Sequence, residues 1–338
     1  MRKLIIILFS IITFFQITAC KRDPYKVNIS SIHVNLKVKR LEKDLFSLNP
    51  ENISGEVPSL KQKYPGFLQL FSWVIKAGDI NDSSFADLLT GFCTDRQNNE
   101  VYQYTMKVFP DISPLQNELE SAFRHYKYYF PERVVPAVYT CITGFNYSII
   151  TGDTILGVSL DRYLGADCRY YPELGIYTYI SARMTPQNVV PDCMYGWADS
   201  EWPFDSIGYS VDNVFSRIIH DGKLKYFEKC MLPGLPDSII FGFTGGQMKF
   251  CSNNELQMWQ YLIEHDLLFS TDQFEIRKLT GESPFTSYFS KESPGRAAVW
   301  IGFRIIEAYM KRNPGLKMED LMKNTDIQAI LKEAKYTP

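Results

Sequence analysis

Histidine is scarce in this chain of 338 residues, which contains four: His33, His125, His220 and His265. No two of them stand four residues apart, and none lies between His125 and His220, so the HExxH spacing of zinc peptidases is absent. The cysteines form no CxxC pair either. The sequence therefore predicts no metal site and no cofactor.

Signatures of two other reaction classes are also missing. No GxSxG marks a serine nucleophile, and no GxxxxGK[ST] loop is present to bind phosphates. The formal net charge of −2 and the pI near 6.1 provide no basic field for nucleic acid. We expect no catalytic residue of these classes and no nucleic-acid partner.

The N-terminus, by contrast, carries a clear signal, "MRKLIIILFSIITFFQITAC". Two basic residues precede an apolar run that is too short for a stable membrane span. The tetrapeptide at 17–20 resembles a bacterial lipobox, in which the chain is cut before the cysteine and its sulfur is acylated. This predicts a signal peptide over 1–19, a lipidated Cys20 and a short tether over 20–30. The mature protein would be lipid-anchored in the cell envelope and face the periplasm, with neither membrane favoured.

The remainder, 31–338, reads as a single α+β domain that is mostly helical. Helical periodicity dominates from about 59 to 130, and β-branched and aromatic residues over about 134–163 predict two or three strands with a hairpin at Gly152-Asp153. Helical periodicity returns over about 207–338, whereas the proline-rich stretch 184–203 is predicted to be partly a loop. Six cysteines follow Cys20; they are as consistent with free, buried thiols as with disulfides.

Two glycines fall on the buried faces of predicted helices. Gly222 lies on the apolar stripe of a helix over 211–229, and Gly302 lies in a helix whose predicted N-cap is Ser293, with Pro294 at the first helical position. A glycine in such a place permits another backbone to approach closely. We expect both glycines to be sites of close helix packing.

Candidate cleft or partner-binding residues lie near these glycines and in the loop. They are His220, Asp221 and Lys223 at the edge of the first stripe, Arg296 beside the second, and Trp197 and Trp202 in the proline-rich stretch. The charged residues face either a groove or plain solvent, and the tryptophans mark a partner surface only if they are exposed. A carboxylate pair acting as acid and base, with Asp221 as one member, is a further possibility.

Five segments carry a resemblance to a known family. They are "YYFPERVVPAVYTCITGFN", "LDRYLGADCRYYP", "IIHDGKLKYF", "ELQMWQYLIEHDLLFSTD" and "SPFTSYFSKESPGRAAVWIGFRIIEAYM". Their order and spacing resemble the gliding-motility lipoprotein GldB family of Bacteroidetes over nearly the whole mature chain. That family is more distantly similar to predicted zinc peptidases of zincin-like fold, in which an acidic residue before a glycine supplies a third ligand. Asp221-Gly222 stands at that position here.

The resemblance implies a zincin-like scaffold that lacks the HExxH ligands. The first hypothesis is thus an envelope lipoprotein, catalytically inactive, whose peptidase-like cleft binds protein partners of the motility or secretion machinery. A metal-independent carboxylate hydrolase or peptidase in the same cleft is the second hypothesis, and a purely structural assembly component is the third.

Overall fold

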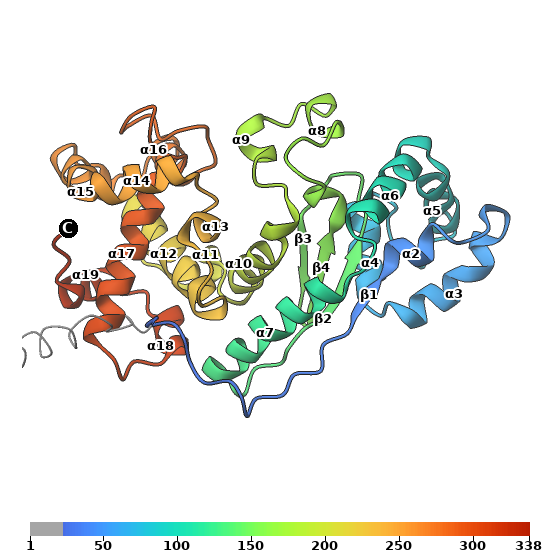
Figure 1. Ribbon diagram of the computed structural model, residues 1–338, viewed down its shortest axis with the longest axis horizontal. Helices are drawn as coiled ribbons and strands as arrows, with labels where there is room; N and C mark the ends of the chain where they lie inside the picture. The colour runs from blue at the N-terminus through green and yellow to red at the C-terminus, as the bar shows by residue number, and fades with distance from the viewer. Residues whose placement is uncertain (1–22) are drawn as a thin grey trace, which may run out of the picture.

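A small mixed sheet lies at the centre of the computed structural model, which describes residues 23–338 (Figure 1). Its strands follow the order β1-β2-β4-β3. Strand β2 (Ala137–Cys141) runs parallel to both β1 (Val38–Arg40) and β4 (Ile155–Ser159), and β3 (Ile149–Gly152) pairs antiparallel with β4 through the predicted hairpin. The predicted α+β fold, mostly helical, is confirmed, and the sheet is of mixed type.

Helices between β1 and β2 form the layer that the periodicity predicts. They also supply the long connection that a parallel β1–β2 pair requires. In chain order they are α2 (Leu41–Leu45), η1 (Pro50–Asn52), α3 (Ile53–Lys63), α4 (Phe67–Val74), α5 (Phe85–Thr94), α6 (Arg96–Val108) and α7 (Ser113–Tyr129).

Helices after the sheet form a second, larger group. Short elements come first: η2 (Leu160–Tyr163), α8 (Tyr170–Glu173), α9 (Thr178–Ser181) and η3 (Pro186–Asn188). The group continues with α10 (Val189–Glu201), α11 (Phe204–Ile207), α12 (Val214–Met231), α13 (Asp237–Phe241), α14 (Gly245–Asn253), α15 (Glu255–Glu264), η4 (Leu267–Phe269), α16 (Gln273–Thr280), α17 (Ala297–Arg312), α18 (Met318–Lys323) and α19 (Ile327–Ala334).

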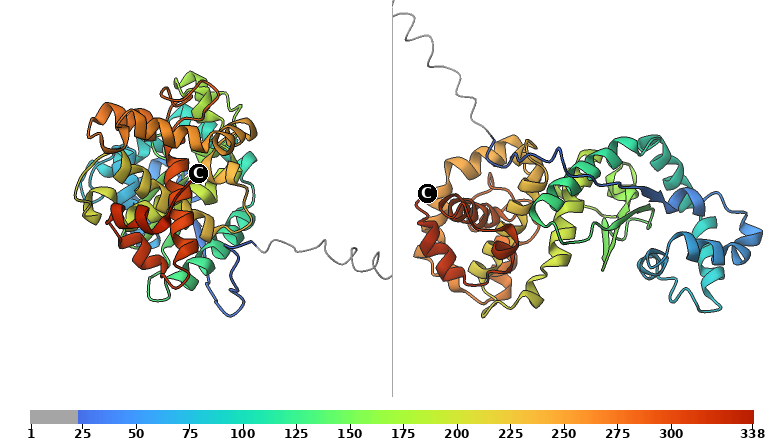
Figure 2. Two further views of the ribbon diagram at one scale, coloured as in Figure 1. Left: turned by 90° about the vertical axis from the view of Figure 1, so that its left-hand side faces the viewer. Right: turned by 90° about the horizontal axis from the view of Figure 1, so that it is seen from below.

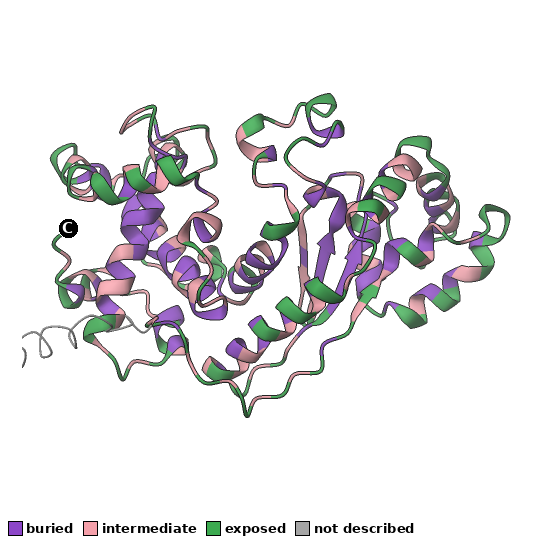
Figure 3. Ribbon diagram, viewed as in Figure 1, coloured by how far each residue is buried: buried purple, intermediate pink, exposed green. Residues whose placement is uncertain are grey.

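The sheet separates two hydrophobic cores, because successive side chains on a strand point to opposite faces. On β2, Val138 belongs to the larger core with the C-terminal helices, and its neighbour Tyr139 belongs to the smaller core with α3, α4 and α5. Tyr139 stacks on Phe67 of α4 with ring centroids 4.5 Å apart. Figure 3 shows the strands buried along most of their length between these helical groups.

Helix α12 runs through the middle of the C-terminal group and crosses α17 at two glycines. A Cβ on Gly222 would lie 2.4 Å from the carbonyl carbon of Gly302, and a Cβ on Gly302 would lie 1.7 Å from the carbonyl oxygen of Ile218. Neither position has room for a side chain. The two helix backbones are therefore in direct contact here, and this contact fixes α12 relative to α17.

Within 184–203, which the sequence predicts to be partly a loop, residues 186–201 are helical. They form η3 and α10, because Pro186 and Pro191 stand in the first turns of their helices, where a missing N–H costs no hydrogen bond. Pro203 comes after α10 has ended.

Helix α17 begins later than predicted. Arg296 has a left-handed backbone with φ of 51°, so the helix starts at Ala297 rather than near Pro294. The Ala297 N–H donates to the hydroxyl of Thr286, whereas the Ser293 hydroxyl donates to the Ser290 carbonyl. The predicted N-cap, Ser293, therefore holds the preceding turn rather than the helix.

The segment predicted as a tether is attached to the body from its first described residues. Tyr25 is 6% exposed, packs edge-on against Tyr226 of α12 and donates its hydroxyl proton to Glu307 of α17. Farther along, Arg124 of α7 donates to the carbonyl of Ile29. Figure 2 shows this segment, in blue, running along the molecule. The tether prediction is thus wrong for residues 25–30, because a buried aromatic ring holds them.

Two predictions concern the envelope setting. Cys20 and the predicted signal lie outside the described residues. All six later cysteines are free and buried: Cys93, Cys141, Cys168, Cys193, Cys230 and Cys251. Within 23–338, no helix combines the length and the apolarity that a membrane span needs.

Candidate functional site

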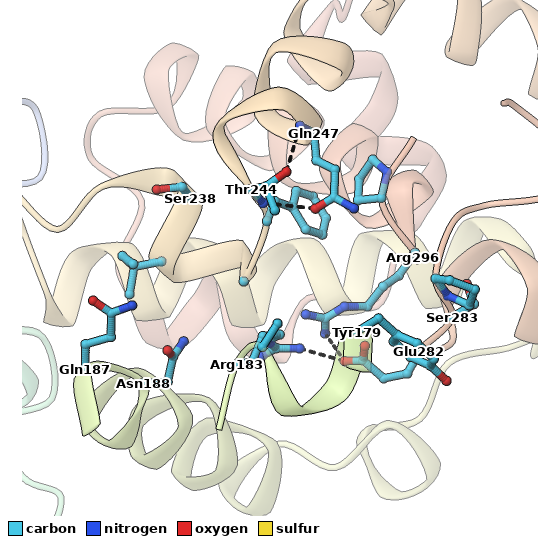
Figure 4. Close-up of a pocket in the computed structure, with 17 residues that line it drawn as sticks. Tyr179, Arg183, Gln187, Asn188, Ser238, Thr244, Gln247, Glu282, Ser283 and Arg296 are labelled. Atoms are coloured by element: carbon cyan, nitrogen blue, oxygen red, sulfur yellow. Dashed lines mark hydrogen bonds and ion pairs between the residues drawn. The ribbon is translucent and has the colours of Figure 1, made fainter. Parts of the chain in front are cut away.

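A pocket of about 260 Å³ opens among α9, η3, α13 and the start of α14. Two loops, 282–284 and 294–296, close its other side (Figure 4). Glycines shape the walls: a Cβ on Gly295 would lie 2.1 Å from the Ser283 carbonyl oxygen. Gly242 has a φ of 65°, and its Cβ would lie 2.1 Å from Nε of Arg183. Chain segments more than a hundred residues apart in sequence therefore meet here.

One carboxylate and two guanidinium groups dominate the pocket. Glu282 Oε1 lies 2.8 Å from Nη1 of Arg183 and 3.3 Å from Nη1 of Arg296 (Figure 4). Burial would raise the pKa of Glu282, but the Arg296 and Arg183 charges outweigh it and hold that pKa below its usual range. Glu282 is thus ionised and bridges two cations.

A second ionic cluster lies behind the pocket, between α10 and α12. Asp192 Oδ1 is 3.6 Å from Nη2 of Arg183, and its other oxygen accepts the Tyr163 hydroxyl at 2.9 Å. Lys225 Nζ lies 2.7 Å from the Glu228 carboxylate. Burial raises the pKa of Glu228 to about 7 against the opposing effect of Lys225. Through Arg183, this cluster is continuous with the charges of the pocket.

Asp221, which the sequence resemblance predicts to stand at the position of a third zinc ligand, does not line the pocket. Burial raises its pKa, although the nearby His220 and Arg296 charges oppose this. Its carboxylate makes no hydrogen bond or ion pair with any residue from 23 to 338. Within those residues Glu282 is the single carboxylate on the pocket wall, so Asp221 and a second carboxylate do not meet in this pocket.

His220 and Lys223 lie away from the pocket, under α11 and the chain that follows it. The His220 ring is 3% exposed and stands edge-on to the rings of Phe204 and Tyr209. Lys223 donates to the Tyr209 hydroxyl and to the Asn324 carbonyl. The prediction that they sit at the edge of a cleft is wrong, because α12 is buried on this side as well.

The tryptophans are likewise buried, so they cannot form a partner surface. Trp197 is 2% exposed and Trp202 is 3% exposed, and both pack against aromatic rings of the larger core. Of the six predicted cleft residues, the structure places Arg296 alone on the pocket wall. Arg183 and Glu282 were missed, since neither lies in a motif and only the fold brings them to Arg296.

The donor set does not fit a divalent cation. Among residues 23–338, no three His, Cys, Asp or Glu side chains are grouped as metal ligands would be. Three acids in the pocket and behind it already face cations: Asp192 and Glu282 face guanidinium groups, and Glu228 faces an ammonium group. A metal ion placed among them would meet three positive side chains.

A comparison with family models matches residues 22–338 to the family described as gliding motility protein GldB. The chain belongs to this family. The match spans the whole described structure, so the sheet, the α12–α17 crossing and the pocket all lie within the GldB region. Searches of curated proteins and of solved structures each returned no match.

Proposed function

We propose that this GldB-family protein is a lipid-anchored envelope component that binds a protein partner at the Arg183–Arg296 pocket and catalyses no reaction. The observation that carries the proposal is the ionic arrangement of the pocket, where two guanidinium groups face one carboxylate that they hold ionised. Paired charges of this kind recognise complementary groups, whereas they provide neither a free general base nor a nucleophile.

The rim of the pocket supports a binding role. Tyr179 lines the pocket and stacks on Tyr177 with ring centroids 5.7 Å apart, and Tyr177 is 67% exposed. Both belong to the α8–α9 arm, which projects from the body in Figure 1. Exposed tyrosines beside an arginine pocket are typical of protein-binding surfaces. A purely structural component would have no need of such a pocket, so this observation favours binding over the assembly alternative.

The hydrolase alternative requires a carboxylate pair in an open pocket. Asp221 lies outside the pocket, and Glu282 is held by Arg183 and Arg296. We therefore rank the hydrolase below partner binding. Anchoring through Cys20 rests on the lipobox and agrees with the lipoprotein character of the family.

A photocrosslinking experiment in cells tests the proposal. A photoreactive amino acid replaces Tyr179 at the pocket or, as the control, Trp73 on α4, which is 59% exposed on the N-terminal layer. We expect one discrete crosslinked protein from position 179 and none from position 73. Arg183→Glu with Arg296→Glu should abolish the adduct without lowering the amount of lipoprotein.

Two results would overturn the proposal. One is recovery of the same crosslinked partner from the double charge-reversal variant at wild-type yield. The other is peptide hydrolysis by the purified lipoprotein that disappears in Asp221→Asn, since this would assign the protein to the carboxylate hydrolases.

A further inference from the structure

Two guanidinium groups in one pocket carry more hydrogen-bond donors than the protein uses. Each guanidinium presents several N–H groups in a planar fork. Arg183 makes one hydrogen bond, to Glu282, and Arg296 makes one, to the Phe241 carbonyl. Nε of Arg183 is buried and has no acceptor among the described residues. This Nε lies against Gly242, so the donors that a ligand oxygen can reach are the remaining terminal N–H groups of the two guanidinium groups on the pocket wall.

We infer that this pocket is a carboxylate-binding site, and that the carboxylate of a protein partner competes there with Glu282 for Arg183 and Arg296. The inference rests on the proposed function, because the carboxylate is taken to belong to a bound protein. It adds the chemistry of recognition: an acidic side chain or a C-terminal carboxylate seated on an arginine fork.

The side chain of Glu282 is exposed enough for a ligand carboxylate to displace it from the two arginines. Its side chain is 50% exposed, whereas those of Arg183 and Arg296 are 23% and 13% exposed. The guanidinium groups are thus fixed by the fold, and the acid that pairs with them stands in solvent contact at the rim. Ion pairs with one solvated partner contribute little to stability, so their exchange for a ligand carboxylate is inexpensive.

The surrounding walls favour an anion of one negative charge. Arg183 and Arg296 carry two positive charges, and Asp192 behind Arg183 offsets one of them, so one positive charge is left for the ligand once Glu282 is displaced. On the opposite wall, Thr244 caps the N-terminus of α14, the positive end of a helix dipole. A carboxylate matches both the planar fork and this charge, whereas a second negative charge on the ligand would have no cation left to pair with.

The test uses the full-length lipoprotein in detergent micelles and three mixed-sequence octapeptide pools. The first pool has a fixed central Glu and blocked ends, and the second has Gln at that position. The third has Gln and a free C-terminal carboxylate. We expect the first or the third pool to bind about tenfold more tightly than the second by calorimetry. Tighter binding of the first pool would identify an acidic side chain as the source of the carboxylate, and tighter binding of the third pool would identify a C-terminus.

Variants connect binding to the named side chains. Arg296→Gln and Arg183→Gln should each reduce binding of the preferred pool to the level of the Gln pool with blocked ends. Glu282→Gln should strengthen it by about three- to tenfold, because it removes the internal competitor. The matched control is Arg304→Gln. Arg304 lies on α17, the helix that follows the pocket loop 294–296, and it pairs with Glu255 and Glu307 outside the pocket.

The outcomes separate this inference from the proposed function. Equal binding of all three pools, or weaker binding by Glu282→Gln, overturns the carboxylate site. If the crosslinked partner at position 179 is still observed, partner binding stands and only its chemistry was wrong. A strengthened response in Glu282→Gln supports the site even if an arginine variant fails to fold.

Discussion

At the scale of single residues, Lys223 is the most unusual ionisable group, because it is buried without a carboxylate partner. Its acceptors are the Tyr209 hydroxyl and the Asn324 carbonyl, and burial lowers its pKa from 10.5 to about 7. The unfolded chain keeps this proton up to about pH 10. Between about pH 7 and pH 10 the unfolded state therefore binds more protons, so this lysine makes the free energy of unfolding rise with pH.

We predict that Lys223→Met removes that dependence. In the wild type, the free energy of unfolding should rise by about 2–3 kcal/mol more between pH 7 and pH 9.5 than in the variant, since each pH unit is worth about 1.4 kcal/mol per proton. Urea unfolding at both pH values measures the difference. Lys311→Met, at an exposed position, serves as the control and should keep the wild-type slope. Parallel slopes for Lys223→Met and wild type would show that Lys223 stays protonated in the folded protein.

Among the elements, the α12–α17 pair depends on the absence of two side chains. A methyl group on Gly302 would meet the Ile218 backbone at 1.7 Å, so Gly302→Ala forces the helices apart. We expect it to lower the free energy of unfolding by about 2 kcal/mol or more. Gly91→Ala on α5 is the matched control: nothing lies within 4 Å of its added Cβ. It should raise stability by about 0.5–1 kcal/mol, as alanine does in a helix. Similar unfolding midpoints for the two variants would rule out a tight crossing.

The elements also show what the sequence could and could not predict. Periodicity located the helical layer, the hairpin and the α12–α17 glycines, because these depend on local spacing and on one buried face. Helix α10 was missed because prolines near both ends suggested a loop. The start of α17 was misplaced because its first N–H is held by Thr286, a contact outside the helix.

The site was less predictable than the fold. Arg296 was found by its place beside a helix, but Arg183 and Glu282 reach it only through tertiary structure. His220 and Lys223 attracted attention by charge, although the rings of α11 and its following loop cover them. A charged residue at the edge of a helix's apolar stripe need not be exposed to solvent. Here the edge of α12 packs against other parts of the protein.

For the whole molecule, Tyr25 determines how far the body can stand from a lipid anchor. Five peptide steps separate Tyr25 from Cys20, and a fully extended chain covers about 3.5 Å per residue. If Cys20 is acylated, as we propose, the end of the body formed by α12 and α17 lies within about 20 Å of the bilayer surface. A partner bound by this protein would then be held close to the membrane as well.

We predict that Tyr25→Ala releases this N-terminal segment. The alanine loses the Tyr226 ring, the Lys229 cation–π contact and the hydroxyl bond to Glu307, so residues 24–34 should exchange amide hydrogen about tenfold faster or more. Hydrogen–deuterium exchange with mass spectrometry of the micelle-bound lipoprotein measures this directly. Tyr128→Ala, at a 46% exposed position on α7, should leave the segment unchanged. Unaltered exchange in Tyr25→Ala would mean that Arg124 and the backbone contacts hold the segment by themselves, and the body would stay near the membrane without the tyrosine.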